Sequence, residues 1–250
     1  MKKILLTTLL TVTTIMAITN EEIAKKADKI TDGFGSSIAQ TEMILVNASG
    51  QKSVRELEMK TLEGEGGDKT ISTFLTPADV KGTKTLTHEH LDRDDDQWLY
   101  LPALKRVKRI ASSNKSGSFM GSEFSYEDIG NQDYEKFTYE GGVEEVELNG
   151  EKCYKGTRIP KDKNSGYTKQ ISLVSMDGFL LKQVEYYDRK SELLKTATFS
   201  DYKEVDGVWR VGKIEMKNHQ NDKSTVLIWK EDKIHAGLTE KEFNKRVLKQ

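Results

Sequence analysis

Apolar side chains recur at every second position through most of this chain, in short segments that polar turns separate. Around Leu57 and Met59, for example, the neighbouring residues are Glu56, Glu58 and Lys60. Alternation at period two is typical of β-strands, because successive side chains point to opposite faces. We predict strands over residues 36–48, 52–63, 69–75, 83–91, 97–101, 106–110, 144–158, 167–176, 179–187, 193–202, 208–217 and 224–231.

The turns between these segments indicate how the strands pair. Asp177-Gly178 and Asp206-Gly207 are typical of two-residue hairpin turns. Consecutive hairpins make an antiparallel sheet, and one sheet of eleven or twelve strands must curl or close. We therefore predict a mainly β protein built on a curled antiparallel sheet. The apolar concave face of that sheet must be filled by side chains, by a helix or by a ligand.

Two capping boxes predict the helices. A threonine followed by a glutamate three residues later is typical of a helix start, and this pattern occurs at Thr19 with Glu22 and at Thr239 with Glu242. The second box predicts a short helix over residues 240–248. The first predicts an amphipathic helix over residues 20–32, which ends before Gly33 and whose apolar residues recur at helical spacing: Ile23, Ala24, Ala27 and Ile30.

The first 17 residues have the layout of a secretory signal peptide. The chain begins Met1-Lys2-Lys3, residues 4–16 are uncharged and mostly apolar, and Ala17 is a small residue near the expected cleavage site. A membrane-spanning helix needs about 20 residues, so this apolar run is too short to be one. We expect residues 18–250 to form a single domain that is exported to the periplasm. Because the only cysteine is Cys153, no cysteine at the cleavage site can carry a lipid, and the protein should be soluble.

The charge of the exported part argues against a nucleic-acid partner. Removal of the two lysines of the signal lowers the basic residues from 39 to 37, against 40 acidic residues, which gives a formal charge of about −3. Proteins that bind nucleic acid carry a basic surface that neutralises phosphates. We therefore expect no nucleic acid among the partners of this protein.

Residues 111–131 form a long segment rich in serine and glycine that also carries bulky apolar side chains. Long loops in compact domains are usually functional or disordered, and the apolar residues argue against disorder. We interpret the segment as a flap over the concave face that is only marginally stable. Its serines and glycines lose backbone entropy on ordering, and its large apolar side chains repay that cost only when they meet an apolar surface. Its ligand-binding candidates are Phe119, Met120, Phe124 and Tyr126. An alternative stays open, in which these four side chains only fill the core beneath an ordinary loop.

Two runs of the sequence resemble the outer-membrane lipoprotein-sorting protein family, whose members are LolA-like relatives of the periplasmic lipoprotein carrier. The runs are Asp94 to Ile110 and Gly117 to Ile129; shorter matches occur at Asp206 to Trp209 and Val226 to Trp229. The resemblance implies a half-open β-barrel of about eleven strands, with helices over the opening and an apolar interior that accepts acyl chains. In the family an arginine helps to latch the lid. Arg55 lies on a predicted strand, but its surroundings do not match the family's motif, so we do not assign it this role.

The resemblance also implies a function. The protein would be a periplasmic carrier or chaperone without catalysis, which shields a lipid or the acyl chains of a lipoprotein. Its further partners would be an inner-membrane hydrophobe-exporting transporter or an outer-membrane acceptor. In the matching run, Trp98, Tyr100 and Leu101 are additional candidates for the cavity. The alternative from another class is a docking or accessory module of such a transporter complex.

A basic cluster within the same run is a candidate docking surface. Its cations could contact a lipid headgroup, an anionic membrane or a transporter. They could equally form a solvated strand face that balances the preceding aspartates. The cluster consists of Lys105, Arg106, Lys108 and Arg109.

Evidence for an enzyme is weak. Ser122 lacks the second glycine of a nucleophile elbow, and no glycine-rich phosphate loop occurs. Cys153 is expected in the core. A metal-dependent hydrolase is a third hypothesis, but no third histidine lies nearby, so we favour a solvated acidic turn with two surface histidines, and we expect no metal and no cofactor. The candidate turn contains His88, Glu89, His90, Asp92, Asp94, Asp95 and Asp96.

Overall fold

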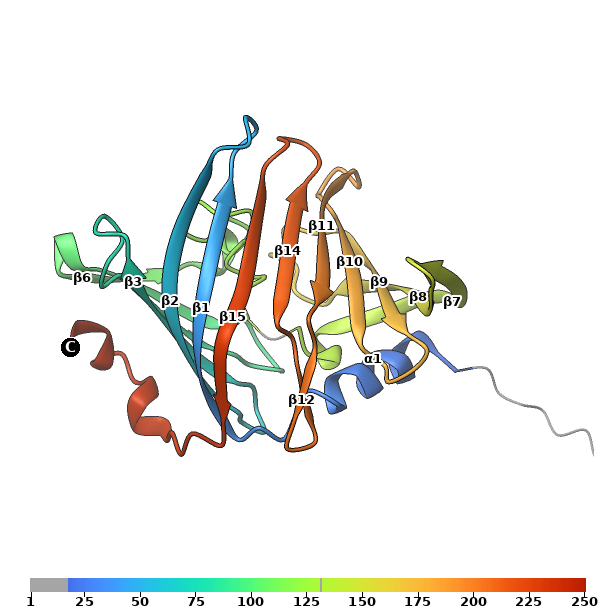
Figure 1. Cartoon of the computed structure of the whole chain (residues 1–250), viewed down its shortest axis with the longest axis horizontal. Coiled ribbons are helices and arrows are strands. Elements are labelled where there is room, and N and C mark those ends of the chain that lie inside the picture. Colours follow the sequence, from blue (N-terminus) through green and yellow to red (C-terminus); the bar gives the residue numbers. More distant parts are fainter. Residues whose placement is uncertain (1–17, 131) are drawn as a thin grey trace, which may run out of the picture.

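Thirteen antiparallel strands form one sheet that curls without closing (Figure 1). The computed structural model describes residues 18–130 and 132–250, so the predicted signal peptide lies outside the described residues. From one edge to the other the strands are β6 (Arg106–Ile110), β5 (Asp96–Leu101), β4 (Lys84–His88), β3 (Lys69–Thr76), β2 (Lys52–Leu62), β1 (Ser36–Val46), β15 (Ser224–Ile234), β14 (Lys213–Asn218), β11 (Leu193–Ser200), β10 (Leu181–Tyr187), β9 (Lys169–Ser175), β8 (Glu151–Pro160) and β7 (Phe137–Leu148). This confirms the predicted curled, half-open sheet.

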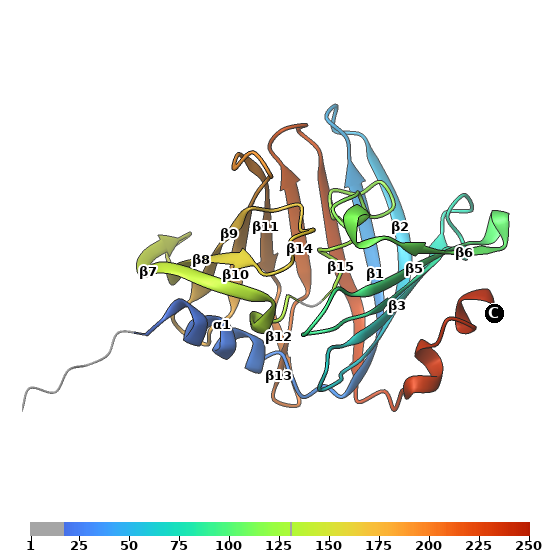
Figure 2. The ribbon, with the colours of Figure 1, turned by 180° about the vertical axis from the view of Figure 1, so that it is seen from behind.

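The sheet consists of two arms that meet at β1 and β15, which pair along residues 37–46 and 224–234. Strands β2 to β6 form one arm, and β14 to β7 form the other. The two edge strands, β6 and β7, are neighbours in sequence although they lie at opposite edges. The chain must therefore cross from one edge to the other between them, and residues 111–130 and 132–136 do so across the inside of the curl (Figure 2).

Two predicted strands are each two strands in the structure. Residues 144–158 contain the end of β7 and the start of β8, joined at Asn149-Gly150. Both turn residues have positive φ, 51° and 86°, as a tight hairpin turn requires. The predicted strand 208–217 is likewise β13 (Val208–Arg210) and β14. β13 leaves the main sheet to pair with β12 (Lys203–Val205) around the predicted Asp206-Gly207 turn.

The helical elements are shorter than predicted. Helix α1 (Asn20–Lys29) starts at the predicted capping box of Thr19 and Glu22, and Ile30 caps its end. The second box, Thr239 with Glu242, also forms. It opens a 3-10 turn at Glu240–Phe243 rather than a helix over 240–248, and a second 3-10 turn follows at Val247–Lys249. Two more 3-10 turns, Ser112–Asn114 and Tyr134–Lys136, lie in the crossing segment, and one, Pro102–Leu104, joins β5 to β6.

The two largest apolar clusters lie on opposite faces of the sheet. The larger one fills the inside of the curl, where side chains of the strands pack against residues 119–129. The smaller one lies on the outside, where Phe243 and Leu248 of the C-terminal segment cover Ile71, Leu86 and Trp98. Strand β5 contributes to both faces by alternation, since Gln97 Nε2 donates to the carbonyl of Tyr126 inside.

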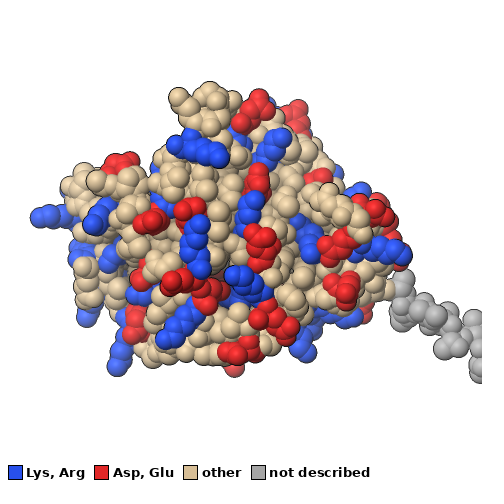
Figure 3. All heavy atoms as spheres, viewed as in Figure 1, with Lys and Arg blue, Asp and Glu red and all other residues tan. Residues whose placement is uncertain are grey.

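The outer surface shows no separation of charge on the face drawn in Figure 3, where basic and acidic side chains are interspersed. Within the described part of the chain, no helix is both long and apolar enough to cross a membrane.

Candidate functional site

A cavity of about 300 Å³ lies between helix α1 and the inner face of the arm that contains β8 to β11. Gly156 of β8 allows the helix to approach this closely, since a Cβ atom there would lie 2.3 Å from Asn20 Oδ1. Asn20 Nδ2 also donates to the carbonyl of Glu140 in β7 over 3.1 Å. The apolar stripe predicted for the first helix faces the cavity with all four residues: Ile23, Ala24, Ala27 and Ile30.

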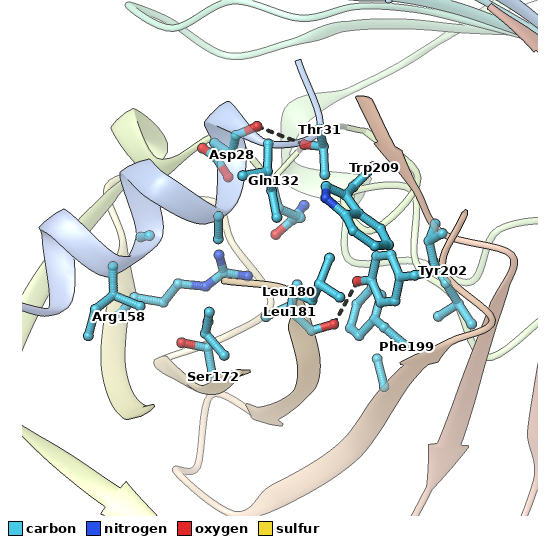
Figure 4. A pocket seen from close by; sticks show the side chains of 18 of the residues that line it. Asp28, Thr31, Gln132, Arg158, Ser172, Leu180, Leu181, Phe199, Tyr202 and Trp209 are labelled. Carbon is cyan, nitrogen blue, oxygen red and sulfur yellow. Dashed lines mark hydrogen bonds between the residues drawn. The ribbon is translucent and has the colours of Figure 1, made fainter. Parts of the chain in front are cut away.

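One end of the cavity is apolar. Leu180, Leu181, Phe199, Tyr202 and Trp209 surround it (Figure 4). The hydroxyl of Tyr202 donates to the carbonyl of Leu181 over 2.6 Å, so the ring is held against the wall. The backbone N–H of Trp209 donates to the carbonyl of Ile30 and ties β13 to the end of α1. This end can accommodate a hydrocarbon chain, because the Tyr202 hydroxyl is already satisfied within the protein.

The other end of the cavity carries charge. Arg158 of β8 is 6% exposed, and its Nε donates to Gln170 Oε1 over 2.9 Å. Asp28 of α1 lies near it (Figure 4). Burial raises the pKa of Asp28 to about 7. The backbone N–H of Tyr134 donates to Asp28 Oδ2 and partly offsets this rise.

The four predicted flap residues all lie inside the curl. Phe119 and Phe124 are 2% and 3% exposed, and Met120 and Tyr126 pack partly buried against the same cluster. Of the four, Phe124 lines the cavity; it also lines a second cavity of about 260 Å³ on the side of β1 to β3. Phe124 therefore borders both spaces. That these side chains contact a ligand stays a prediction.

Buried polar contacts hold the flap, defined here as residues 111–130. Lys195 Nζ lies 2.5 Å from Asp128 Oδ2 and donates to the carbonyl of Glu123 over 2.9 Å. The hydroxyl of Tyr167 donates to Asp128 Oδ1 over 2.8 Å. Thr225 Oγ1 accepts from the N–H of Glu123 over 3.0 Å. These polar contacts add to the apolar ones, and sequence analysis did not identify them because Lys195, Tyr167 and Thr225 lie far from the flap in sequence. That the flap is marginally stable stays a prediction.

Arg55 contacts the flap, although its sequence surroundings gave no reason to assign it. Its Nη1 donates to the carbonyl of Met120 over 2.5 Å, and its guanidinium carbon lies 6.0 Å from the centre of the Phe74 ring. Partial burial lowers the pKa of Arg55. This arginine therefore joins β2 to the tip of the flap.

The structure corrects two of the three other cavity candidates, which all lie on β5. Trp98 and Tyr100 belong to the outer cluster, where Lys245 Nζ lies 4.5 Å from the Trp98 ring centre. Leu101 is not among the residues that line the main cavity. Trp98 and Tyr100 were mistaken for cavity residues because alternation assigns two faces to a strand but does not say which face is inside.

The predicted basic cluster lies on and beside β6, at an open edge of the sheet. Lys105, Arg106, Lys108 and Arg109 are all exposed, and Arg109 Nη2 pairs with Asp96 Oδ1 over 2.5 Å. None of the four lines the main cavity. Leu104 stands beside them with 55% of its surface exposed.

The acidic turn between β4 and β5 is less solvated than predicted. Glu89 is 3% exposed and lies 3.1 Å from Lys136 Nζ. His88 Nε2 donates to the carbonyl of Phe243 over 2.6 Å, and burial lowers the pKa of His88. His90 Nε2 lies 3.3 Å from Asp96 Oδ2 instead. Within residues 18–130 and 132–250, no group of three or more His, Cys, Asp or Glu side chains is placed to hold a metal ion.

Ser122 and Cys153, the two nucleophile types considered in the sequence, occupy positions in the packed structure. The hydroxyl of Ser122 donates to the carbonyl of Phe119 over 2.7 Å and shapes the tip of the flap. Cys153 is buried, as predicted. The residues that sequence analysis missed are Arg158 and Asp28. No local signal identifies them, because the groups around Arg158 come from α1, β7, β9 and β10 and meet only in the fold.

Comparisons with known proteins agree with this geometry. A family model described as "uncharacterized protein" matches residues 66–250. A domain from Vibrio parahaemolyticus designated an outer-membrane lipoprotein-sorting protein is 48% identical over 92% of this chain and 98% of that domain, with a TM-score of 0.88. A DUF1329 family protein from Desulfovibrio piger is 32% identical over 91% of this chain and 97% of its own, with a TM-score of 0.85.

A more distant likeness concerns the fold. A LolA superfamily protein from Nitrosomonas europaea is 19% identical, with a TM-score of 0.75. The match covers 92% of this chain and 100% of that protein. No curated protein matches the chain significantly. The fold of this chain is thus an architecture that these solved structures share.

Proposed function

Because this chain belongs to the family of LolA-like outer-membrane lipoprotein-sorting proteins, we propose that it is a periplasmic carrier that shelters an acyl chain. The chain would be held in the cavity between α1 and the inner face of the sheet. Export to the periplasm would follow from the signal peptide that residues 1–17 predict. The protein performs no chemistry on its ligand in this proposal; it binds, shields and releases.

The observation that supports this proposal most strongly is the apolar end of the cavity. Moving a hydrocarbon chain from water to an apolar site is favourable by about 0.8 kcal/mol per CH₂ group, so a chain of about 12 carbons gains roughly 10 kcal/mol of shelter. The walls formed by Leu180, Leu181 and Phe199 provide such a site. A cavity of about 300 Å³ is at the lower end of the range for small-molecule pockets, roughly 300–1,000 Å³, so it suits one slender chain.

Movement of the flap would enlarge this space. Phe124 and Asp128 line both the main cavity and the second one of about 260 Å³. A shift of the Phe124 ring would connect the two, and Arg55 at Met120 would hold or release the tip. A carrier needs both a closed and a loading state, and these contacts define the difference between them.

The proposal is tested by filling the cavity from helix α1. Ala27→Trp places a large ring in the cavity, whereas Lys29→Trp places the same ring on the exposed side of the same helix. Protein purified from the periplasm should carry lipid, detected by native mass spectrometry, in the wild type and in Lys29→Trp but not in Ala27→Trp. Wild-type protein that is always empty and does not bind dodecan-1-ol would contradict the proposal.

An additional docking role is favoured by the open edge at β6. Lys105, Arg106 and Lys108 are exposed beside the apolar side chain of Leu104. Cations that flank an exposed apolar residue fit an anionic membrane surface, to which each contributes about 1 kcal/mol. We propose that this edge approaches a membrane during loading or delivery.

A further inference from the structure

Shelter of a hydrocarbon chain does not explain the charged end of the cavity. Arg158 is 6% exposed, and its Nη2 has no hydrogen-bond partner among the described residues. A buried charged donor without a partner is costly, because it loses its hydration and gains nothing in exchange. Figure 4 shows the guanidinium group extending toward the middle of the cavity rather than into the sheet.

The guanidinium group is held in a fixed orientation. Its Nε donates to Gln170 Oε1 over 2.9 Å, and its central carbon lies 4.1 Å from the centre of the Phe137 ring. Gln170 stands opposite Arg158 in the pairing of β8 with β9, so both side chains point inward. These contacts occupy Nε and one face of the group. They leave Nη2 buried, without a hydrogen-bond partner in the described part of the chain, in a residue that lines the cavity.

The protein supplies only a weak counter-charge. Burial lowers the pKa of Arg158, and Asp28 is the carboxyl group that opposes this shift. Because burial raises the pKa of Asp28 to about 7, much of this carboxyl is protonated near neutral pH. The charged end therefore keeps a positive character that an anion can neutralise.

We propose that Arg158 binds the anionic headgroup, a carboxylate or a phosphate, of an amphiphile whose acyl chain lies along Leu181 and Phe199. The planar donors of a guanidinium match the geometry of both anions. The inference rests on the proposed function, since it assigns the ligand's polar end within the same cavity. It also assigns a substrate class, namely single-chain anionic lipids rather than neutral ones.

Binding of paired probes tests the proposal. Dodecanoate and dodecan-1-ol have the same chain and differ in charge, and acetate and inorganic phosphate supply an anion without a chain. A hydrogen bond to a charged group contributes enough for a preference of about tenfold or more. Wild-type protein should bind dodecanoate more tightly than dodecan-1-ol by that factor in isothermal titration calorimetry. Arg158→Met should abolish the preference by weakening dodecanoate binding alone.

Two further variants keep the test decisive. Arg158→Lys retains the charge without the planar group and should retain part of the preference. Ser172→Asp supplies a carboxylate on the same face of β9, at a diagonal position to Arg158, and should displace dodecanoate even if Arg158→Met does not fold. Arg246→Met, at an exposed arginine of the C-terminal segment, is the control and should bind both probes normally.

Each contrary outcome has a distinct meaning. The headgroup assignment is overturned if the wild type binds dodecanoate and dodecan-1-ol with equal affinity. It is also overturned if Arg158→Met weakens the binding of both probes equally. Either result leaves the carrier function intact. Binding of acetate or phosphate as tight as that of dodecanoate overturns it as well, because the site would then take free anions. Failure of the wild type to bind either chain probe overturns the proposed function itself.

Discussion

The ammonium group of Lys195 lies 2.5 Å from the carboxylate of Asp128, and the two side chains are only 4% and 2% exposed. Lys195 belongs to β11 and Asp128 to the flap, so this buried pair joins the cover to the wall of the curl. Tyr167 donates to the same carboxylate and Lys195 also donates to the carbonyl of Glu123. The pair therefore fixes the base of the flap, while Arg55 contacts its tip.

Loss of one partner of this pair should release the flap. Lys195→Met leaves a buried carboxylate uncompensated, and breaking such a pair costs about 3–5 kcal/mol. Urea unfolding measures the loss, and hydrogen exchange over residues 111–130 should become faster. Lys155→Met removes a lysine from an exposed pair with Glu144 and should cost no more than about 1 kcal/mol. Equal effects of the two variants would show that the buried pair does not anchor the flap.

Phe124 should control the length of the chain that the protein accepts. Phe124→Ala connects the two cavities, so the preferred alkanol should become longer than in the wild type. Phe119→Ala removes a ring of equal size that does not line the main cavity. Each variant should lose about 3–5 kcal/mol of stability. Only Phe124→Ala should shift the chain-length profile in a fluorescent-probe displacement assay; the same shift in both would contradict the assignment.

The stability of the protein should fall as the pH rises through the titration of Asp28. Its pKa is about 7 in the folded protein against an ordinary value of 3.8, so the folded state binds more protons than the unfolded chain between these values. After burial, which raises this pKa most, and the Tyr134 N–H, which lowers it, the charged groups that affect it are Asp133 and Asp32, which raise it, and Arg158, which lowers it. Asp28→Asn should match the wild type below about pH 3, where the carboxyl is largely protonated in both states, and should exceed it at pH 8, by at most about 4 kcal/mol.

Thermal unfolding at the two pH values measures this difference. The exposed Asp177→Asn is the control and should follow the wild type at both. The same ionisation should weaken dodecanoate binding above pH 7, because a charged Asp28 competes for Arg158. If Asp28→Asn showed the wild-type pH profile for both stability and binding, Asp28 would not be the titrating group.

The basic edge should determine binding to anionic membranes. Changing Lys105, Arg106 and Lys108 together to glutamate removes three contacts worth about 1 kcal/mol each. Co-sedimentation with vesicles that contain phosphatidylglycerol should be lost, and dodecan-1-ol binding should not change. Changing Lys203, Lys217 and Lys233 to glutamate alters the net charge equally at exposed positions on other strands. Equal loss in both triple variants would indicate a general charge effect rather than a docking edge.

The alternation of apolar residues was sufficient to predict the curled sheet, because burial of one face imposes period two. It was not sufficient for every boundary. The strand predicted over 144–158 passes through Asn149-Gly150, a turn signal that the flanking alternation obscured. The spacing of Ile23, Ala24, Ala27 and Ile30 predicted the face of α1 that lines the cavity, since this pattern depends on the helix alone.

The charged end of the cavity could not be predicted in this way. Arg158, Asp28 and Gln170 are separated by more than one hundred positions or lie on paired strands, and only tertiary packing brings them together. Trp98 shows the opposite error, because its motif is conspicuous but its side chain packs outside. Sequence patterns identify which residues are buried more reliably than they identify the compartment in which they are buried.

The seam between β1 and β15 has a consequence for how the molecule forms. It joins residues 37–46 to residues 224–234, so the centre of the sheet needs both ends of the chain. A chain delivered from its N-terminus exposes β1 as an unpaired edge until the last long strand arrives. Contacts this distant in sequence form slowly. Until β1 pairs with β15, the two arms are not joined in one sheet. The interior between the two arms therefore depends on the pairing of β15 with β1, and no hairpin of either arm can enclose it alone.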